Sequence, residues 1–290
     1  MVSEAEVRLR LKTDLEYYAK KCLKIRGKDK LQNFILNKAQ LYIHDLLEKQ
    51  LLETGRVRAI ILKGRQQGCS TYAEARLMWK VTHTKGVRAF ILTHEESASQ
   101  TLFEIAKRYY DNLPDQIKPS ISAVNSKELR FDKLDSGYRV GTAGNKSVGR
   151  SQTNQFFHGS EVAFWPNAAE HAKGILQTVP NSDNTEVIYE STANGVGNFF
   201  HEQWKAAESG QSDFIPIFIP WFWQDEYRRK TPDDFELLDE EVLLKNYYLL
   251  DNEQIYWRRK KIVELSAGGM DGSKSFMQEY PMNAVEAFQV

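Results

Sequence analysis

Residues 64–71, with the sequence GRQQGCST, combine the residue types of a phosphate-binding loop. They follow an apolar run at 57–63 and precede a stretch of helical periodicity at 71–82. Between a strand and a helix, backbone N–H groups and the positive end of the helix can surround a phosphate. Gly68 and Ser70 stand where the P-loop pattern has its last glycine and its magnesium-binding hydroxyl. The segment therefore predicts a site for the phosphate groups of a nucleotide.

The loop departs from that pattern at the positions that carry charge. Cys69 occupies the lysine position, and Lys63 falls where the first glycine would stand. A different cation must then face the phosphates. Arg65 is the first candidate, because it lies within the loop and its planar guanidinium can contact two phosphate oxygens. Lys63 is the second. Taken alone, the segment is equally consistent with a glycine-rich turn between a strand and a helix.

A carboxylate follows the apolar run at 155–158. Glu161 comes at the carboxyl end of this predicted strand, the edge of a parallel sheet where ligands bind. It can orient and polarise an attacking water, with Glu190 as the alternative acid. Ser160 replaces the aspartate that usually precedes such a glutamate. We therefore expect Ser70 and Glu161, with phosphate oxygens and water, to hold a magnesium ion. As an isolated feature, an acid after an apolar strand is more often a helix cap or a surface residue.

Residues 190–195, with the sequence ESTANG, end the next apolar run at 186–189. The small hydroxyl and amide side chains of Thr192 and Asn194 can hydrogen-bond a terminal phosphate and respond to its loss. The glycines at 195 and 197 allow the backbone to approach closely. This segment is a third candidate contact with a nucleotide.

The elements that must position these residues alternate between strand and helix. Apolar runs predict strands at 57–63, 87–93, 155–158, 186–189 and 214–219, and helical patterns cover 4–24, 38–53, 71–82, 97–112 and 167–178. Residues 128–142 predict an antiparallel hairpin. The alternation predicts an α/β fold with a mainly parallel central sheet flanked by helices. After Trp221 the sequence becomes charged and helical, which predicts a small, mostly helical C-terminal subdomain.

Composition excludes several classes of protein. Lys+Arg and Asp+Glu both number 39, so the net charge gives no reason to expect nucleic-acid binding over the whole surface. Basic clusters at 20–30, 228–230 and 258–261 could contact DNA locally, although each also fits a solvated helix face. The two cysteines support neither a disulfide framework nor a zinc site. No apolar run is long enough for a membrane span, and the first residues do not resemble a secretory signal.

The order of these motifs resembles the large terminase family of tailed double-stranded DNA phages. The similar segments are a deviant Walker A of the form RQxGxS/T at 65–70, an acidic strand end followed by VAFW at 160–165, and STANG at 191–195. Residues 34–40 (FILNKAQ) resemble the family's adenine-recognising segment, with Gln40 as the contact. Residues 278–281 (QEYP) and 286–288 (EAF) resemble its linker.

This resemblance implies a P-loop ATPase of the ASCE type that binds ATP and Mg²⁺ and moves double-stranded DNA into a procapsid. It implies the portal protein and the small terminase subunit as partners, a homo-oligomeric ring when docked at the portal with a monomer in solution as the other state, and the host cytoplasm as location. The implied parts are an N-terminal helical segment (1–55), an ATPase core (56–220) and a helical linker subdomain (221–290). In the family a nuclease domain follows the linker, so we expect no nuclease activity from this chain.

The expected site has two groups of residues. The catalytic group comprises Glu161, Arg65 and Arg150. Arg150 lies in a glycine- and serine-rich stretch, and we expect it to reach a neighbouring subunit's ATP, although a solvated arginine fits the sequence equally well. The expected nucleotide contacts are Gln40, Lys63, Gly64, Arg65, Gln66, Gln67, Gly68, Cys69, Ser70, Thr71, Thr192 and Asn194.

Two other functions fit these observations. A helicase or recombination ATPase would share the phosphate loop, the acid and the third motif. Alternatively, the altered loop could be a relic in a docking module that binds the portal without hydrolysing ATP. Strand separation on a forked duplex would favour the first alternative, and failure to bind ATP would favour the second.

Overall fold

The computed structural model describes residues 3–144 and 152–289, and its centre is an eight-stranded sheet. The strand order is β10-β3-β9-β8-β4-β7-β6-β5. Neighbouring strands are parallel from β10 to β7, and only β6 and β5 add antiparallel pairs at one edge. The strands are β3 (Val57–Lys63), β4 (Arg88–Thr93), β5 (Ala123–Val124), β6 (Glu128–Phe131), β7 (Ser136–Thr142), β8 (Phe156–Ser160), β9 (Glu186–Ser191) and β10 (Ile215–Ile219). The predicted α/β fold with a mainly parallel sheet is confirmed.

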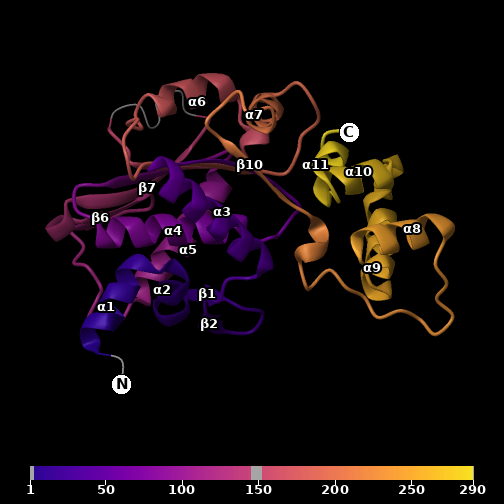
Figure 1. The fold of residues 1–290 in the computed structure, drawn as a ribbon, viewed down its shortest axis with the longest axis horizontal. Coiled ribbons are helices and arrows are strands. Elements are labelled where there is room, and N and C mark those ends of the chain that lie inside the picture. Colours follow the sequence, from indigo (N-terminus) through magenta and orange to yellow (C-terminus); the bar gives the residue numbers. More distant parts are fainter. Residues whose placement is uncertain (1–2, 145–151, 290) are drawn as a thin grey trace.

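Helices cover both faces of this sheet (Figure 1). One face carries α1 (Glu4–Thr13), α2 (Leu15–Cys22), α3 (Lys38–Thr54), α4 (Cys69–His83) and α5 (Glu96–Asp111), and the other carries α6 (Ala168–Leu176) and α7 (Phe199–Glu208). Alternate residues of β3 enter two separate cores: Ala59 and Ile61 pack towards α3 and α4, whereas Ile60 and Leu62 pack on the opposite side. Burial on both faces explains why the parallel strands read as continuous apolar runs.

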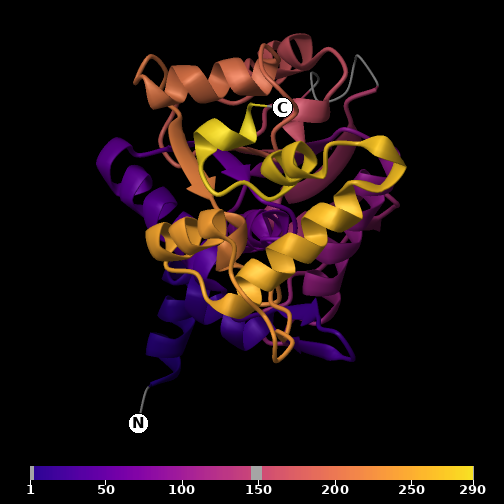
Figure 2. The same ribbon diagram turned by 90° about the vertical axis from the view of Figure 1, so that its right-hand side faces the viewer.

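The C-terminal part is helical, as predicted, and lies in front of the sheet in Figure 2. It contains α8 (Asp239–Tyr248), α9 (Asn252–Leu265), α10 (Gly272–Glu279) and α11 (Ala284–Ala287). Its small core is aromatic: the rings of Tyr227 and Trp257 stack with centroids 4.3 Å apart, and Trp221 is fully buried beside them. This segment therefore has a hydrophobic cluster of its own.

Several local features differ from the sequence prediction. The helix expected at 4–24 is two helices, because Asp14 leaves the helical conformation and caps α2 by accepting from the Tyr17 N–H at 2.8 Å. The next residues form a short hairpin of β1 (Lys24–Arg26) and β2 (Leu31–Asn33) that was not predicted. Short 3₁₀ helices occur at η1 (Asp132–Leu134), η2 (Val162–Phe164), η3 (Trp221–Trp223) and η4 (Ala267–Gly269). Among the helices described, none has the length and apolar character needed to cross a membrane.

Candidate nucleotide-binding site

The segment predicted to bind phosphate, residues 64–68 and named the phosphate loop below, joins β3 to α4 and ends in a glycine. Gly68 has φ of +77°, in the left-handed region. A Cβ atom on it would lie 2.6 Å from Nε2 of Gln40, which is too close for any real contact. α4 begins at the next residue, so its first N–H groups, which lack partners within the helix, face the loop.

Helix α3 and the residue that caps its N-terminus hold one side of this loop. Gln40 Nε2 donates to the Gly68 carbonyl at 2.8 Å, and Asn37 Nδ2 donates to the Gln67 carbonyl at 3.2 Å. Gln40 Oε1 also accepts from the Asn37 N–H at 2.9 Å, and the side chain is buried. Its amide therefore supports the loop, and contact with an adenine stays a prediction.

The C-terminal segment holds the other side of the loop. Four hydrogen bonds to backbone carbonyls contribute to this connection: Arg65 N–H to Glu279 O (2.9 Å), Tyr227 Oη to Arg65 O (2.8 Å), Gln67 Nε2 to Trp221 O (3.2 Å) and Gln224 Nε2 to Gln66 O (2.6 Å). The shape of the phosphate loop thus depends on residues from opposite ends of the chain.

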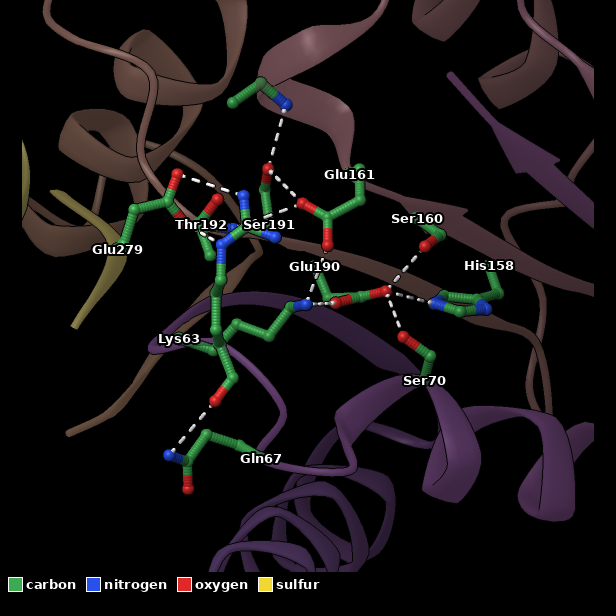
Figure 3. A network of polar contacts seen from close by, with 12 residues as sticks. Lys63, Gln67, Ser70, His158, Ser160, Glu161, Glu190, Ser191, Thr192 and Glu279 are labelled. Carbon is green, nitrogen blue, oxygen red and sulfur yellow. Dashed lines mark hydrogen bonds and ion pairs between the residues drawn. The ribbon is translucent and has the colours of Figure 1, made fainter. Parts of the chain in front are cut away.

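Lys63, the last residue of β3, lies between two carboxylates (Figure 3). Its Nζ is 2.9 Å from Oε1 of Glu161 and 2.8 Å from Oε2 of Glu190. Burial disfavours the charge of Lys63, but the charges of Glu190 and Glu161 outweigh burial and raise the pKa of Lys63 above its ordinary value. A protonated lysine therefore occupies the centre of the site.

Arg65 pairs with a different acid, Glu279 of α10. Its guanidinium donates to the carboxylate of Glu279, with Nη2 3.0 Å from Oε1, and its side chain is 55% exposed. The hydrogen bond that Arg65 donates to Glu279 is the main cause that raises the pKa of Arg65. Of the two candidate cations, the structure places Lys63 beside the acids and Arg65 beside the C-terminal segment. A contact of Arg65 with phosphate stays a prediction.

Glu190, near the end of β9, is the acceptor around which the other polar groups gather. Its Oε1 accepts from Ser70 Oγ and from Ser160 Oγ, each at 2.7 Å. His158 Nε2 lies 3.5 Å from the same oxygen. Burial raises the pKa of Glu190, but Lys63 and His158 reverse this effect and hold it well below the ordinary value. Glu190 is therefore an ionised carboxylate with no exposed surface.

His158 continues this network into the core. Its Nδ1 lies 2.7 Å from Oε1 of Glu74, a buried residue of α4. Burial lowers the pKa of His158, but its hydrogen bonds and the charges of Glu190 and Glu74 raise it to about 9. His158 and Glu74 were not predicted as site residues. The histidine inside an apolar run at 155–158 could have indicated them, because a buried polar side chain needs hydrogen-bond partners.

Glu161 leaves β8 in a left-handed conformation, with φ of +53°. This conformation is uncommon for a residue other than glycine and costs on the order of 1–3 kcal/mol. Glu161 Oε2 accepts from Ser191 Oγ at 3.3 Å and from the Thr192 N–H at 3.4 Å. Asn194 Nδ2 donates to the Ala163 carbonyl at 3.2 Å. The structure thus brings residues 191–194 together with the acid at 161.

The remaining predicted contacts lie around the loop. Burial raises the pKa of the Cys69 thiol to about 12, so the usual lysine position holds a neutral group. Gly64 donates its N–H to the Ile219 carbonyl at 3.0 Å, and the Thr71 carbonyl accepts from Tyr109 Oη at 3.0 Å. Arg150 lies outside the described residues.

A strand–loop–helix unit on a mainly parallel sheet, with acids at the ends of adjacent strands, is the arrangement of the P-loop fold class. No family model matches the sequence. The HK97 bacteriophage large terminase is similar in structure with a TM-score of 0.65 at 13% identity, over 93% of this chain and 54% of that chain. The Thermus phage P74-26 large terminase ATPase domain gives 0.59 at 16% identity, over 86% of this chain and 94% of that chain. The thermophilic bacteriophage D6E large terminase gives 0.52 at 10% identity, over 78% and 52% of the two chains.

These matches narrow the fold to that of the ATPase domain of large terminases, as the motifs had suggested. The chain spans about half the length of the HK97 protein. At such low identity the likeness concerns the fold alone.

Proposed function

We propose that this chain is the ATPase motor of viral genome packaging, which hydrolyses ATP to move double-stranded DNA into a procapsid. The observation that carries this proposal is the cluster of Lys63, Ser70, Glu161 and Glu190 at the carboxyl edge of the sheet, beside a phosphate loop, in the fold of a large terminase ATPase domain. A large terminase of phage D6E, similar at a TM-score of 0.52, has been solved in complex with ADP.

The loop and the start of α4 would bind the phosphates. Backbone N–H groups at the helix N-terminus favour negative charge, and Lys63 supplies the full positive charge that Cys69 cannot. Lys63 already contacts two acids, so a bound phosphate would compete with them for its ammonium group. We therefore assign Lys63 the role of the Walker A lysine, and Arg65 the role of fixing the loop against Glu279.

Glu161 would act on the water that attacks the terminal phosphate. Its side chain is 26% exposed, in contrast to the fully buried Glu190, so it can reach a ligand at the edge of the sheet. A carboxylate in this position orients water and accepts its proton. The contacts of Ser191 and Thr192 hold Glu161 in place, and they link its position to the segment that would contact the terminal phosphate.

Magnesium fits the oxygen ligands of this site. When bound, it would neutralise charge on the phosphate oxygens. Ser70 and the nearby carboxylates offer the hard oxygen ligands that Mg²⁺ prefers. Within the described ranges no group of three or more His, Cys, Asp and Glu residues could hold a metal alone. Phosphate oxygens and water would therefore supply most of the ligands, as is usual for Mg²⁺ at nucleotide sites.

The proposed partners are double-stranded DNA, the portal protein and the small terminase subunit. We place the chain in a ring at the portal, in the host cytoplasm.

Arg150 would act across subunits. Mixing Arg150→Ala subunits with Glu161→Gln subunits tests this role, since an intact Arg150 on one subunit could serve an intact Glu161 on its neighbour. Verified mixed rings that recover no turnover would rule it out.

Hydrolysis and DNA movement test the function together. We expect DNA-dependent phosphate release by the wild type and its loss in Lys63→Met. The matched control is Lys49→Met, which removes an exposed lysine of α3. Translocation is then measured as displacement of a third strand from a DNA triplex. Unwinding of a forked duplex without triplex displacement would support the helicase alternative, and portal binding without ATP binding would support the docking module.

A further inference from the structure

β9 lies between β3, which precedes the phosphate loop, and β8, which ends in Ser160 where an aspartate is usual. In the sheet it pairs with β3 on one side and with β8 on the other. The register sets Glu190 opposite Ile61 of β3 and opposite Ser160 of β8. A carboxylate on Glu190 is therefore one strand nearer the phosphate loop than a carboxylate at position 160 would be.

The contact between Glu190 and Ser70 determines how the loop hydroxyl is oriented. Ser70 Oγ is 2.7 Å from Glu190 Oε1, and the carboxylate can only accept, so the serine donates its proton. A hydroxyl has one proton and two lone pairs, which leaves the lone pairs of Ser70 free to face a cation. In P-loop NTPases the loop hydroxyl and an acid from a neighbouring strand hold magnesium together. In this chain the acid that contacts the loop hydroxyl is Glu190.

The serine at position 160 fits the same arrangement. Its hydroxyl donates to Glu190 Oε1 at 2.7 Å, so the two side chains already touch. A second carboxylate at this distance would repel the first, and the two could not both ionise readily. Ser160 instead supports the charge of Glu190, together with Lys63 and His158 on the other sides of the same carboxylate. A fully buried carboxylate needs such partners to stay ionised.

We propose that Glu190 has taken over the magnesium-anchoring role of the acid absent from position 160. Glu190 is a positioning residue: by accepting the Ser70 proton, it turns the lone pairs of that hydroxyl towards the magnesium ion that accompanies the nucleotide. Ser160 in turn fixes the carboxylate of Glu190. This inference rests on the proposed function, because it requires a magnesium–nucleotide complex at this loop. It differs from the sequence expectation, which gave Glu161 as the acidic ligand.

The test measures how much magnesium strengthens nucleotide binding. The affinity for the fluorescent, non-hydrolysable analogue mant-AMPPNP is determined in Mg²⁺ and in EDTA, and the ratio of the two dissociation constants is the magnesium effect. Glu190→Asp keeps the charge but withdraws the carboxylate from Ser70. We expect it to lower the magnesium effect roughly 10–100-fold, the usual loss when a partner of a metal ligand is altered, with little change in EDTA.

Three further variants separate the contributions. Glu190→Gln should lower the magnesium effect at least as much, with folding checked by thermal denaturation because Lys63 and His158 lose a buried partner. Ser160→Asp in the Glu190→Gln background returns an acid to the strand end, and we expect it to restore part of the magnesium effect. Glu161→Gln tests the competing candidate, since it makes the same change in the other acid that contacts Lys63.

The outcomes distinguish this inference from the proposed function. A wild-type protein that does not bind mant-AMPPNP overturns both. Normal binding with an unchanged magnesium effect in Glu190→Asp overturns only the role of Glu190. Loss of the magnesium effect in Glu161→Gln alone would return the magnesium ligand to Glu161. If the Glu190 variants lose the magnesium effect and Ser160→Asp restores part of it, the result supports a transfer of the magnesium-anchoring role from β8 to β9.

Discussion

Acid should weaken a buried ion pair that fixes α4 against the sheet. Arg76 of α4 contacts Glu186, the first residue of β9, through two bonds of 2.6 and 3.0 Å, and both side chains are fully buried. Lys80 lies 3.2 Å from the same carboxylate. Burial raises the pKa of Glu186, but the charges of Arg76 and Lys80 outweigh it and lower this pKa from 4.5 to about 2.

The size and sign of the effect follow from this difference. A carboxyl whose pKa is depressed in the folded state stabilises the fold above its unfolded pKa and loses that contribution as pH falls. The difference between 4.5 and about 2 corresponds to about 3 kcal/mol at neutral pH, lost at about 1.4 kcal/mol per pH unit between pH 4.5 and 2. Glu186→Gln should therefore cost at least about 3 kcal/mol at pH 6, because it also leaves Arg76 without its buried partner.

Urea unfolding at several pH values between 6 and 3.5, followed by tryptophan fluorescence, measures this contribution. The difference in unfolding free energy between the wild type and Glu186→Gln should shrink once the pH falls below 4.5. Glu48→Gln is the matched control: it contacts the same guanidinium at 2.6 Å but is 34% exposed, so its loss should be below about 1 kcal/mol. A difference for Glu186→Gln that stays constant across this pH range would refute the reasoning.

Three further outcomes concern the site. Glu161→Gln should bind ATP but hydrolyse it roughly 10²–10⁴-fold more slowly in single-turnover assays, and normal turnover would exclude it as the base. Arg65→Ala and Glu279→Gln should slow hydrolysis equally, by up to about tenfold, if Arg65 only fixes the loop; a much larger loss in Arg65→Ala would show that it acts on phosphate. Gly68→Ala should weaken nucleotide binding in a fluorescence titration. Gly86→Ala, with a similar φ but open space around it, should bind normally.

The sequence predicted the parts of the fold that depend on continuous apolar runs. β3 was predicted with its observed bounds, because a strand buried on both faces contains little but apolar residues. The hairpin at 24–33 was missed, because its two short strands contain few apolar residues and are mostly exposed. Asp14 reads as an ordinary helical residue, and only the structure shows that it caps α2.

Residue types and strand ends can be taken from the sequence, but which side chains contact one another cannot. Ser70 and Glu161 were expected near one another because the carboxyl ends of parallel strands share an edge. The partners of Lys63 depend on the strand order, which places β9 beside β3, and no local pattern gives that order. The direction of Arg65 depends on Glu279, 214 residues away along the chain. Which of the two cations faces the acids is therefore decided by contacts between distant residues, and it can be seen only in the folded structure.

The hydrogen bonds that tie the phosphate loop to the C-terminal segment also limit how genes with this fold can exchange pieces. In two of the four bonds the C-terminal segment contributes a backbone carbonyl, which any residue supplies, but in the other two it contributes the side chains of Tyr227 and Gln224. On the N-terminal side, Asn37 and Gln40 make equally specific contacts. A recombination point between residues 40 and 224 would combine the phosphate loop of one parent with hydrogen-bond partners from the other parent. Viable hybrids should therefore inherit residues 37–279 from a single parent, whatever lies on either side.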